Sequence, residues 1–140
     1  MFGKELVFLD SSVVVHAAGN IGYTWAVAIL NQGLTREQAL VTDTLCLQEV
    51  EDILSHLLEP DQVIHALEVY RAAVTEVIAV TADDFAQSRV LRRRYAHVSP
   101  RECLHAAVMQ RANICKVCAV TESTYREFAE LEYVVLLKED

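Results

Sequence analysis

Three carboxylates stand where an α/β protein gathers the side chains that do its chemistry. Asp10 ends the apolar run 6–9 and precedes a second apolar stretch, 13–15. A buried strand that stops on an acid delivers that acid to the edge of a sheet. Glu49 and Glu102 recur at the starts of later helical segments. Because clustered carboxylate oxygens bind hard divalent cations such as Mg²⁺, the series predicts a divalent-cation site.

Short apolar strands and amphipathic helices alternate along the chain and must position these acids. The sequence predicts strands over 5–9, 41–42, 76–81, 116–121 and 132–138. It predicts helices over 23–32, 43–58, 60–74, 83–95 and 99–112. Strands interleaved with helices predict an α/β fold, a three-layer α/β/α sandwich whose mostly parallel sheet is covered on both faces. The length of 140 residues predicts one domain over 1–140, with its site at the carboxyl ends of the strands.

Two local signals predict how the segment around residue 35 folds. Gly33 is suited to the left-handed position after a helix, so the helix that begins near Tyr23 is expected to end there. The following Thr-Arg-Glu-Gln, residues 35–38, has the form of a capping box. A further helix is therefore expected after Thr35.

Composition narrows the class of protein. Apolar residues make up 53% of the chain and charged residues 23%, which is typical of a folded globular protein. No apolar run approaches the roughly 20 residues that a membrane span needs, and the N-terminal segment lacks a signal-peptide layout, so we expect a cytoplasmic protein without a membrane anchor. Cys115 and Cys118 have the spacing of a zinc or redox pair, but they lie in an apolar predicted strand and are interpreted as packed, reduced thiols.

The residues around the three acids resemble the PIN domains, including the VapC-type toxin ribonucleases, over nearly the whole chain. The strand-Asp-Ser-Ser signature is matched by residues 7–12, and the Thr-x-x-Leu-x-x-x-Glu-like pattern by residues 42–49. The Asp-Ala-x-His-Ala-Ala-like helix start is matched by 102–107, with Glu102 in the place of the Asp. The fourth acid of the family falls at Ser123, and Glu122, one residue earlier, is its candidate substitute.

The resemblance implies an endoribonuclease that uses Mg²⁺ or Mn²⁺. It implies catalytic and metal-ligating roles for Asp10, Glu49 and Glu102, and a metal-ligating role for Glu122. It further implies RNA as substrate, an antitoxin protein as partner in a toxin–antitoxin pair, and a homodimer. From first principles, carboxylate-held divalent cations supply what phosphodiester hydrolysis needs, because they acidify bound water and neutralise charge on the phosphate.

Each acid also has a structural interpretation. Asp10 is a suitable N-cap for a following helix, a role that is compatible with metal binding. Glu49 alone would be read as a solvated helix residue, and Ser99 with Glu102 fits a capping box around Pro100. These alternatives leave a second function open, in which a PIN-like domain with impaired catalysis acts as a protein- or RNA-binding module.

Charge gives a mixed indication about nucleic acid. The net charge of −8 opposes non-specific adhesion to RNA. Basic side chains nevertheless cluster near Glu102, and the nucleic-acid-binding candidates are Ser12, Arg92, Arg93, Arg94 and Arg101. The arginines have two other interpretations: a solvated helix end, and a surface that pairs with an acidic segment of a partner protein.

Overall fold

Apolar, β-branched runs build the centre of the protein. The computed structural model describes residues 5–19, 24–120, 124–129 and 131–135. Five strands form one sheet in the order β3-β2-β1-β4-β5, and every neighbouring pair is parallel. The elements follow in the order β1 (Leu6–Leu9), α1 (Ser11–Ala18), α2 (Thr24–Leu34), β2 (Ala39–Asp43), α3 (Thr44–Ser55), α4 (Pro60–Ala73), β3 (Glu76–Ile78), α5 (Ala82–Arg94), α6 (Pro100–Arg111), β4 (Lys116–Ala119), the 3₁₀ turn η1 (Tyr125–Glu127) and β5 (Glu132–Val135).

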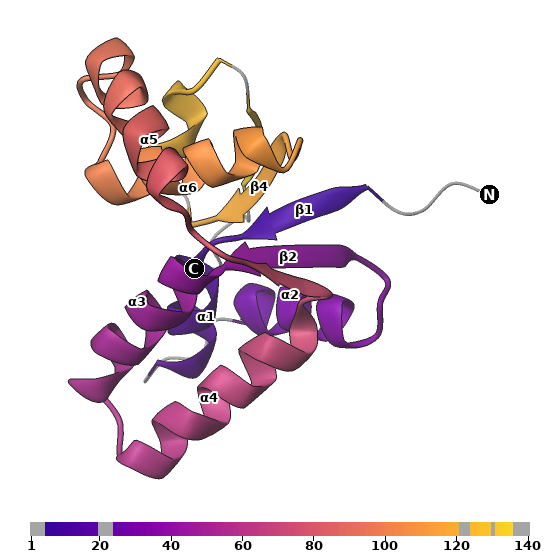
Figure 1. The fold of residues 1–140 in the computed structure, drawn as a ribbon. Coiled ribbons are helices and arrows are strands. Elements are labelled where there is room, and N and C mark those ends of the chain that lie inside the picture. Colours follow the sequence, from indigo (N-terminus) through magenta and orange to yellow (C-terminus); the bar gives the residue numbers. More distant parts are fainter. Residues whose placement is uncertain (1–4, 20–23, 121–123, 130, 136–140) are drawn as a thin grey trace.

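Helices cover both faces of the sheet, as Figure 1 shows. Helices α1 to α4 lie on one face, and α5 and α6 pack against each other on the other face. The α/β/α sandwich predicted from the sequence is therefore confirmed. Its sheet buries Phe8, Leu9 and Val41 completely, together with Val117 of β4. None of the helices among the described residues is both long and apolar enough to cross a membrane.

The strand order reverses between β1 and β4. The chain moves outward from β1 to β2 and β3, then crosses back to place β4 on the other side of β1. In parallel sheets such a reversal opens a crevice at the carboxyl ends of the two strands. Asp10, which follows β1, donates its backbone N–H to the carbonyl of Cys118 in β4 at 3.0 Å. The first of the three acids thus lies at the reversal.

Most predicted elements are confirmed, but the helix expected after Thr35 is wrong. Residues 35–38 form a turn that leads directly into β2, and Arg36 takes the left-handed conformation there with φ of 63°. The capping pattern has no helix to follow because Ala39, Leu40 and Val41 pair with Leu6, Val7 and Phe8 of β1. Tertiary pairing of an apolar run therefore overrides the local capping signal.

Gly33 has a different role from the one predicted. It lies inside the last turn of α2, not after it, and it is buried. A Cβ atom built at Gly33 would meet the backbone carbonyl oxygen of Ala73 at the end of α4, and would lie 2.7 Å from Cδ1 of Leu40. The glycine is needed because α2 passes close to the backbone of α4.

Replacing Gly33 with Ala should therefore destabilise the fold. We expect the free energy of unfolding to fall by about 1 to 3 kcal/mol, the usual cost of overpacking a core. Urea unfolding of Gly33→Ala measures this loss. The control is Asn31→Ala, an exposed position of the same helix, which should stay within about 0.5 kcal/mol of the wild type. Equal stabilities for the two variants would contradict the close-approach argument.

Candidate cation site at the carboxyl edge of the sheet

Asp10 is wholly buried at the end of β1 and has two structural duties. As the N-cap of α1, its Oδ2 accepts a hydrogen bond from the backbone N–H of Ser12 at 3.0 Å. Its Oδ1 accepts from the Tyr125 hydroxyl at 2.7 Å and from Nη2 of Arg101 at 2.8 Å. The N-cap role of Asp10 is therefore compatible with a role in the site, because the two use different oxygens.

Two buried hydroxyl groups hold the end of β1 in place. The carbonyl of Leu9 accepts hydrogen bonds from the Tyr70 hydroxyl at 2.8 Å and from Thr42 Oγ1 at 3.1 Å. All three residues are fully buried. Because the peptide that precedes Asp10 is held by two side chains, the acid has little freedom to move with its backbone.

Glu49 enters the site from α3, the helix that follows β2. Its Oε1 accepts from Ser11 Oγ at 2.9 Å and lies 3.1 Å from Nε2 of His105 on α6. The other ring nitrogen of His105 is 2.6 Å from Oδ2 of Asp43. His105 is wholly buried and bridges two carboxylates, so it fixes α6 to α3 beneath the site.

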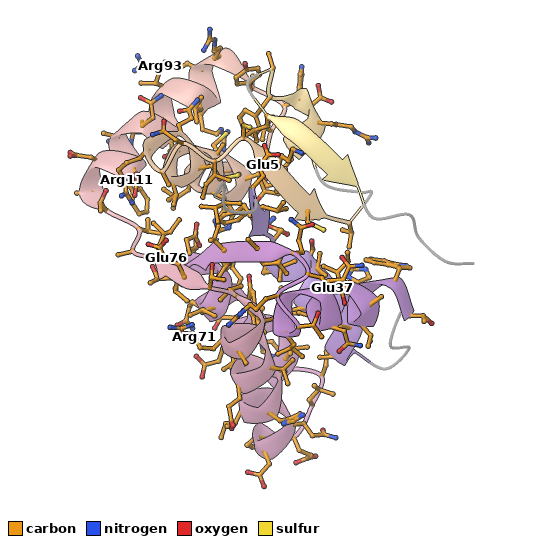
Figure 2. The ribbon with its side chains drawn as sticks, turned by 90° about the vertical axis from the view of Figure 1, so that its right-hand side faces the viewer. Glu5, Glu37, Arg71, Glu76, Arg93 and Arg111 are labelled. Carbon is orange, nitrogen blue, oxygen red and sulfur yellow. The ribbon has the colours of Figure 1, made fainter. Side chains whose placement is uncertain are left out.

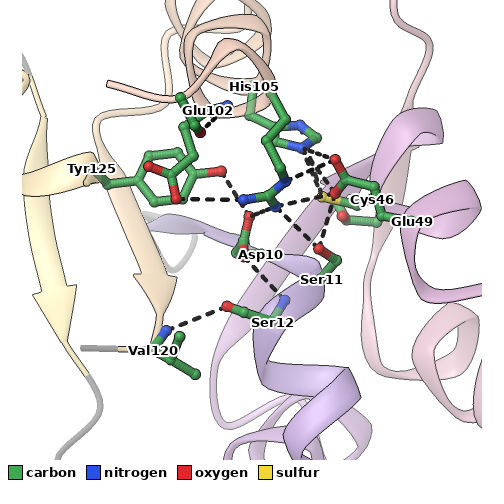
Figure 3. Close-up of polar contacts among 12 residues, drawn as sticks. Asp10, Ser11, Ser12, Cys46, Glu49, Glu102, His105, Val120 and Tyr125 are labelled. Atoms are coloured by element: carbon green, nitrogen blue, oxygen red, sulfur yellow. Dashed lines mark hydrogen bonds and ion pairs between the residues drawn. The ribbon is translucent and has the colours of Figure 1, made fainter. Parts of the chain in front are cut away.

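Arg101 and Glu102 come from the first turn of α6, which begins at the Ser99 N-cap. The guanidinium of Arg101 lies among the carboxylates of Asp10, Glu49 and Glu102, whose side chains are labelled in Figure 3. Besides Asp10, it contacts Glu49 Oε2 through Nε at 2.9 Å and Glu102 Oε2 through Nη1 at 3.4 Å. Arg101 was a nucleic-acid-binding candidate from the sequence, a role that remains a prediction; in the structure it contacts acids of its own chain.

In Asp43 and Glu102, one carboxylate oxygen accepts hydrogen bonds from the backbone and the other faces the cationic side chains of the site. Asp43 caps α3 with Oδ1, which accepts from the backbone N–H of Cys46 at 2.8 Å, and turns Oδ2 toward His105. Glu102 Oε1 accepts from the backbone N–H of Thr124 at 2.8 Å and from the Thr124 hydroxyl, while Oε2 faces Arg101. Ser99 does cap the N–H of Glu102, but the Glu102 carboxylate turns to Thr124 and not back to Ser99. Asp10, Asp43 and Glu102 are therefore each oriented through one oxygen, while the other oxygen faces Arg101 or His105.

Electrostatics follows from this arrangement. Burial raises the pKa of Glu49, but hydrogen bonds and charge from His105 and Arg101 outweigh it and bring the pKa down to about 2. Burial lowers the pKa of His105, yet its interactions with Cys46, Asp43 and Glu49 raise it well above its ordinary value. Burial also raises the pKa of the Cys46 thiol to about 11. At neutral pH, the site thus holds an ionised Glu49, a protonated imidazole and a neutral thiol.

Three of the predicted acids are brought together, as expected. Asp10, Glu49 and Glu102 converge on the guanidinium of Arg101. Glu122 lies outside the described residues. The metal-ligating and catalytic roles assigned to these acids remain predictions.

Among the candidates for nucleic-acid binding, Arg101 contacts the acids through its guanidinium, and Ser12 donates its backbone N–H to Asp10. The side chain of Ser12 accepts from the backbone N–H of Val120 at 3.3 Å, which joins α1 to the end of β4. Arg92, Arg93 and Arg94 are exposed in the last turn of α5, and Figure 2 shows Arg93 on the outside of the molecule. Their role in nucleic-acid binding remains a prediction.

Three residues of the site were missed from the sequence. Asp43 carries the same signal as Asp10, an acid between a strand and a helix, and that signal was available. Cys46 and Tyr125 carry no such signal, because a buried thiol and a buried tyrosine look like core residues in a sequence. The ligand atoms of Asp10, Cys46 and His105 all lie within 4.8 Å of one another, the only such group of three among the described residues.

The donor set fits a hard cation. Three carboxylates surround a position that a positive group already takes, and Glu49 is held ionised there. Hard divalent ions such as Mg²⁺ prefer this oxygen chemistry and need few protein ligands. The fold and the site together define an α/β domain with an acidic, cation-accepting cluster at the carboxyl edge of a parallel sheet.

Comparison with known families agrees with this description. The PIN domain family model matches residues 7–121, so the chain belongs to the PIN domain family. Asp10, Glu49 and Glu102, which carried the resemblance in the sequence, lie at the cluster, and Glu122 lies outside the described residues. No curated protein sequence matches the chain at a significant level.

Solved structures share the fold at low sequence identity. VapBC2 from Rickettsia felis, bound to a DNA fragment from its promoter, has a TM-score of 0.73 and 15% identity, and the match covers 93% of this chain and 98% of that one. VapC20 from Mycobacterium tuberculosis, a toxin that cleaves the sarcin–ricin loop, has a TM-score of 0.64 and 19% identity. The match covers 79% of this chain and 86% of that one. A toxin–antitoxin complex from Klebsiella pneumoniae has a TM-score of 0.65 and 14% identity, and the match covers 95% of this chain and 99% of that one.

The low pKa of Glu49 predicts a dependence of stability on pH. A carboxylate whose pKa falls from 4.5 to about 2 on folding contributes roughly 3 kcal/mol above pH 4.5, and that contribution is lost as the pH falls toward 2. Glu49→Gln should therefore be less stable than the wild type at pH 7, and the gap should shrink to roughly half or less at pH 3. Urea unfolding from pH 7 to pH 3 measures the gap.

The matched control is Glu51→Gln, an exposed acid on the same helix. Its difference from the wild type should stay small at every pH, because an exposed pair is worth little. A gap for Glu49→Gln that is independent of pH would show that Glu49 is not held by its charge.

Proposed function

We propose that the chain is a divalent-metal-dependent endoribonuclease, the toxin component of a toxin–antitoxin pair, which hydrolyses RNA phosphodiester bonds in the cytoplasm. The observation that carries the proposal is the convergence of Asp10, Glu49 and Glu102 on one cation position. Membership in the PIN domain family supports a nuclease, and similarity to the sarcin–ricin loop-cleaving toxin supports RNA as the substrate.

The chain's own residues would prepare the site in defined ways. Asp10, Glu49 and Glu102 would hold Mg²⁺ or Mn²⁺, which when bound acidifies water and neutralises charge on a phosphate. Tyr125 orients Asp10 by donating to Oδ1, and His105 orients Glu49. Thr124 fixes the far oxygen of Glu102, so the longer side chain of Glu is anchored where the family has Asp.

RNA would be held by cations outside the acidic cluster. Arg92, Arg93 and Arg94 form the last turn of α5 with exposed side chains, and they belong to the helix that packs on α6. A net charge of −8 makes such a local basic patch necessary, because the protein as a whole repels RNA.

An antitoxin protein is the partner we propose. Several similar structures are toxin–antitoxin assemblies, among them the Klebsiella pneumoniae complex and VapBC-1 from nontypeable Haemophilus influenzae, which has a TM-score of 0.62 at 14% identity. The site itself supports the proposal, since an acidic cluster that accepts the guanidinium of Arg101 has the chemistry to accept an arginine from a partner.

Cleavage of RNA should require both the metal and Asp10. Purified protein and Asp10→Asn are incubated with a panel of structured RNAs and single-stranded DNA, with Mg²⁺, Mn²⁺ or EDTA. We expect cleavage of RNA with metal, none with EDTA, and a loss in the variant that exceeds the roughly 100-fold cost typical of removing an outer-shell partner of a metal site. Inducing wild-type protein in cells, but not Asp10→Asn, should arrest growth.

The control is Asp52→Asn, an exposed acid on α3, which should cleave like the wild type. Thermal unfolding of both variants separates loss of the site from loss of the fold. A folded wild-type protein that cleaves nothing and arrests no growth would contradict the nuclease.

One observation favours a second function. Arg101 already fills the acidic cluster, and Glu102 gives one oxygen to Thr124, so the cluster is satisfied without a metal. This arrangement suits a PIN domain that acts as a protein- or RNA-binding module with impaired catalysis. The absence of cleavage in a protein that still binds RNA or an antitoxin would favour the module.

We also propose a homodimer, as the resemblance to VapC toxins implies. Large apolar side chains are exposed on α3, α4 and α5, including Ile53, Ile64 and Phe85, each more than 40% accessible. Exposed apolar surface of this kind is typical of association between proteins. Light scattering should give twice the chain mass of 15.7 kDa, and a mass of one chain at micromolar concentration would contradict the dimer.

A further inference from the structure

Arg101 lies where the proposed metal would bind. Its Nη2 is 2.8 Å from Asp10 Oδ1 and 3.1 Å from Glu49 Oε1, its Nε is 2.9 Å from Glu49 Oε2, and its Nη1 is 3.4 Å from Glu102 Oε2. It adjoins Glu102 in the first turn of α6, and its side chain is 36% exposed. Every one of the three acids is engaged by this single side chain.

A guanidinium and a divalent ion cannot share these oxygens. Mg²⁺ binds oxygen at about 2.0 to 2.1 Å, so its ligands close around a point. A planar guanidinium holds the oxygens that accept its hydrogen bonds farther apart than a metal ion would, because its N–H groups point outward from different edges of the plane. Consistent with this, no group of three ligand atoms drawn from Asp10, Glu49 and Glu102 lies within 4.8 Å. The acids are spaced for Arg101.

Charge makes the exchange favourable once a metal is present. Asp10, Asp43, Glu49 and Glu102 face two cationic groups, Arg101 and His105. His105 is wholly buried and cannot leave without unpacking α6, whereas Arg101 reaches solvent directly. A divalent ion brings one charge more than the guanidinium it replaces, and carboxylates that are close together repel one another without a cation.

We propose that Arg101 is an internal counter-ion of the metal-free site, which a divalent cation must displace in order to bind. The inference rests on the proposed function, since it concerns the same cation site. It gives Arg101 a role distinct from contact with RNA: the side chain stabilises the empty cluster and sets the metal concentration at which the site is loaded.

Metal affinity in Arg101 variants tests the inference. Mn²⁺ is titrated by calorimetry into the full chain, its Arg101→Gln and Arg101→Lys variants, Asp10→Asn, and Arg71→Gln. The last removes the same charge from an exposed position on α4, seen in Figure 2. Because the hydrogen bonds of Arg101 to carboxylates no longer compete, Arg101→Gln should bind Mn²⁺ at least about tenfold more tightly than the wild type. Arg101→Lys should lie between them, and Arg71→Gln should stay within about twofold, as expected for a screened exposed charge.

The outcomes separate the inference from the proposed function. If wild-type protein binds Mn²⁺ through Asp10 and Arg101→Gln binds no more tightly, the counter-ion role is wrong while the metal site stands. If Mn²⁺ binding is undetectable in the wild type and in Arg101→Gln, or is the same in Asp10→Asn, the metal site itself is wrong and the inference fails with it.

A second measurement needs no variant at Arg101. In the wild type, the Nε–Hε signal of Arg101 should be separate from those of exposed arginines, because it donates to Glu49. Adding diamagnetic Mg²⁺ should move this signal to the position of the exposed arginines as the ion binds. A signal that stays in place while Mg²⁺ binds through Asp10 would overturn the inference.

Discussion

The structure depends on keeping several carboxylates ionised in a small, mostly buried space. Asp10 and Asp43 are wholly buried; Arg101 contacts Asp10, Glu49 and Glu102, and His105 contacts Asp43 and Glu49. Buried charge without a partner costs several kcal/mol per ion. Arg101 and His105 meet that cost from opposite sides, one from the solvent face and one from the core. Without them, or a metal in the place of Arg101, the acids would have to separate or take up protons.

The topology explains why this space lies at the edge of the sheet. Asp10 follows β1 and Asp43 is the last residue of β2, and each caps the next helix, so each transition from strand to helix places an acid and orients one of its oxygens. The crossover from β3 to β4 then brings α6 over the same edge, with Arg101, Glu102 and His105 in its first two turns. The cap fixes one oxygen of each strand-end acid, and the site uses the other.

Two of the predicted acids could be found because strand ends and helix starts leave local signals. Asp10 and Glu102 stood in patterns of apolar and capping residues, whereas Glu49 was assigned to the site through the resemblance to PIN domains. The partners could not be found in this way. Tyr125 reaches Asp10 across 115 positions of sequence, and His105 reaches Asp43 across 62, so their contacts exist only after the sheet has formed. The helix expected after Thr35 was wrong for the same reason, since pairing with β1 outweighed a valid local signal.

Arg101 connects the two functions that the sequence left open. In a binding module, an arginine that pairs with the acids only stabilises the fold. In a nuclease, the same side chain must leave, and its contacts with Asp10, Glu49 and Glu102 subtract from the affinity for the metal. Both proteins would have this fold and this metal-free site. What distinguishes them is the free-energy difference between a guanidinium and a hydrated divalent ion on the same oxygens, a difference that one substitution at Arg101 changes without touching an acid.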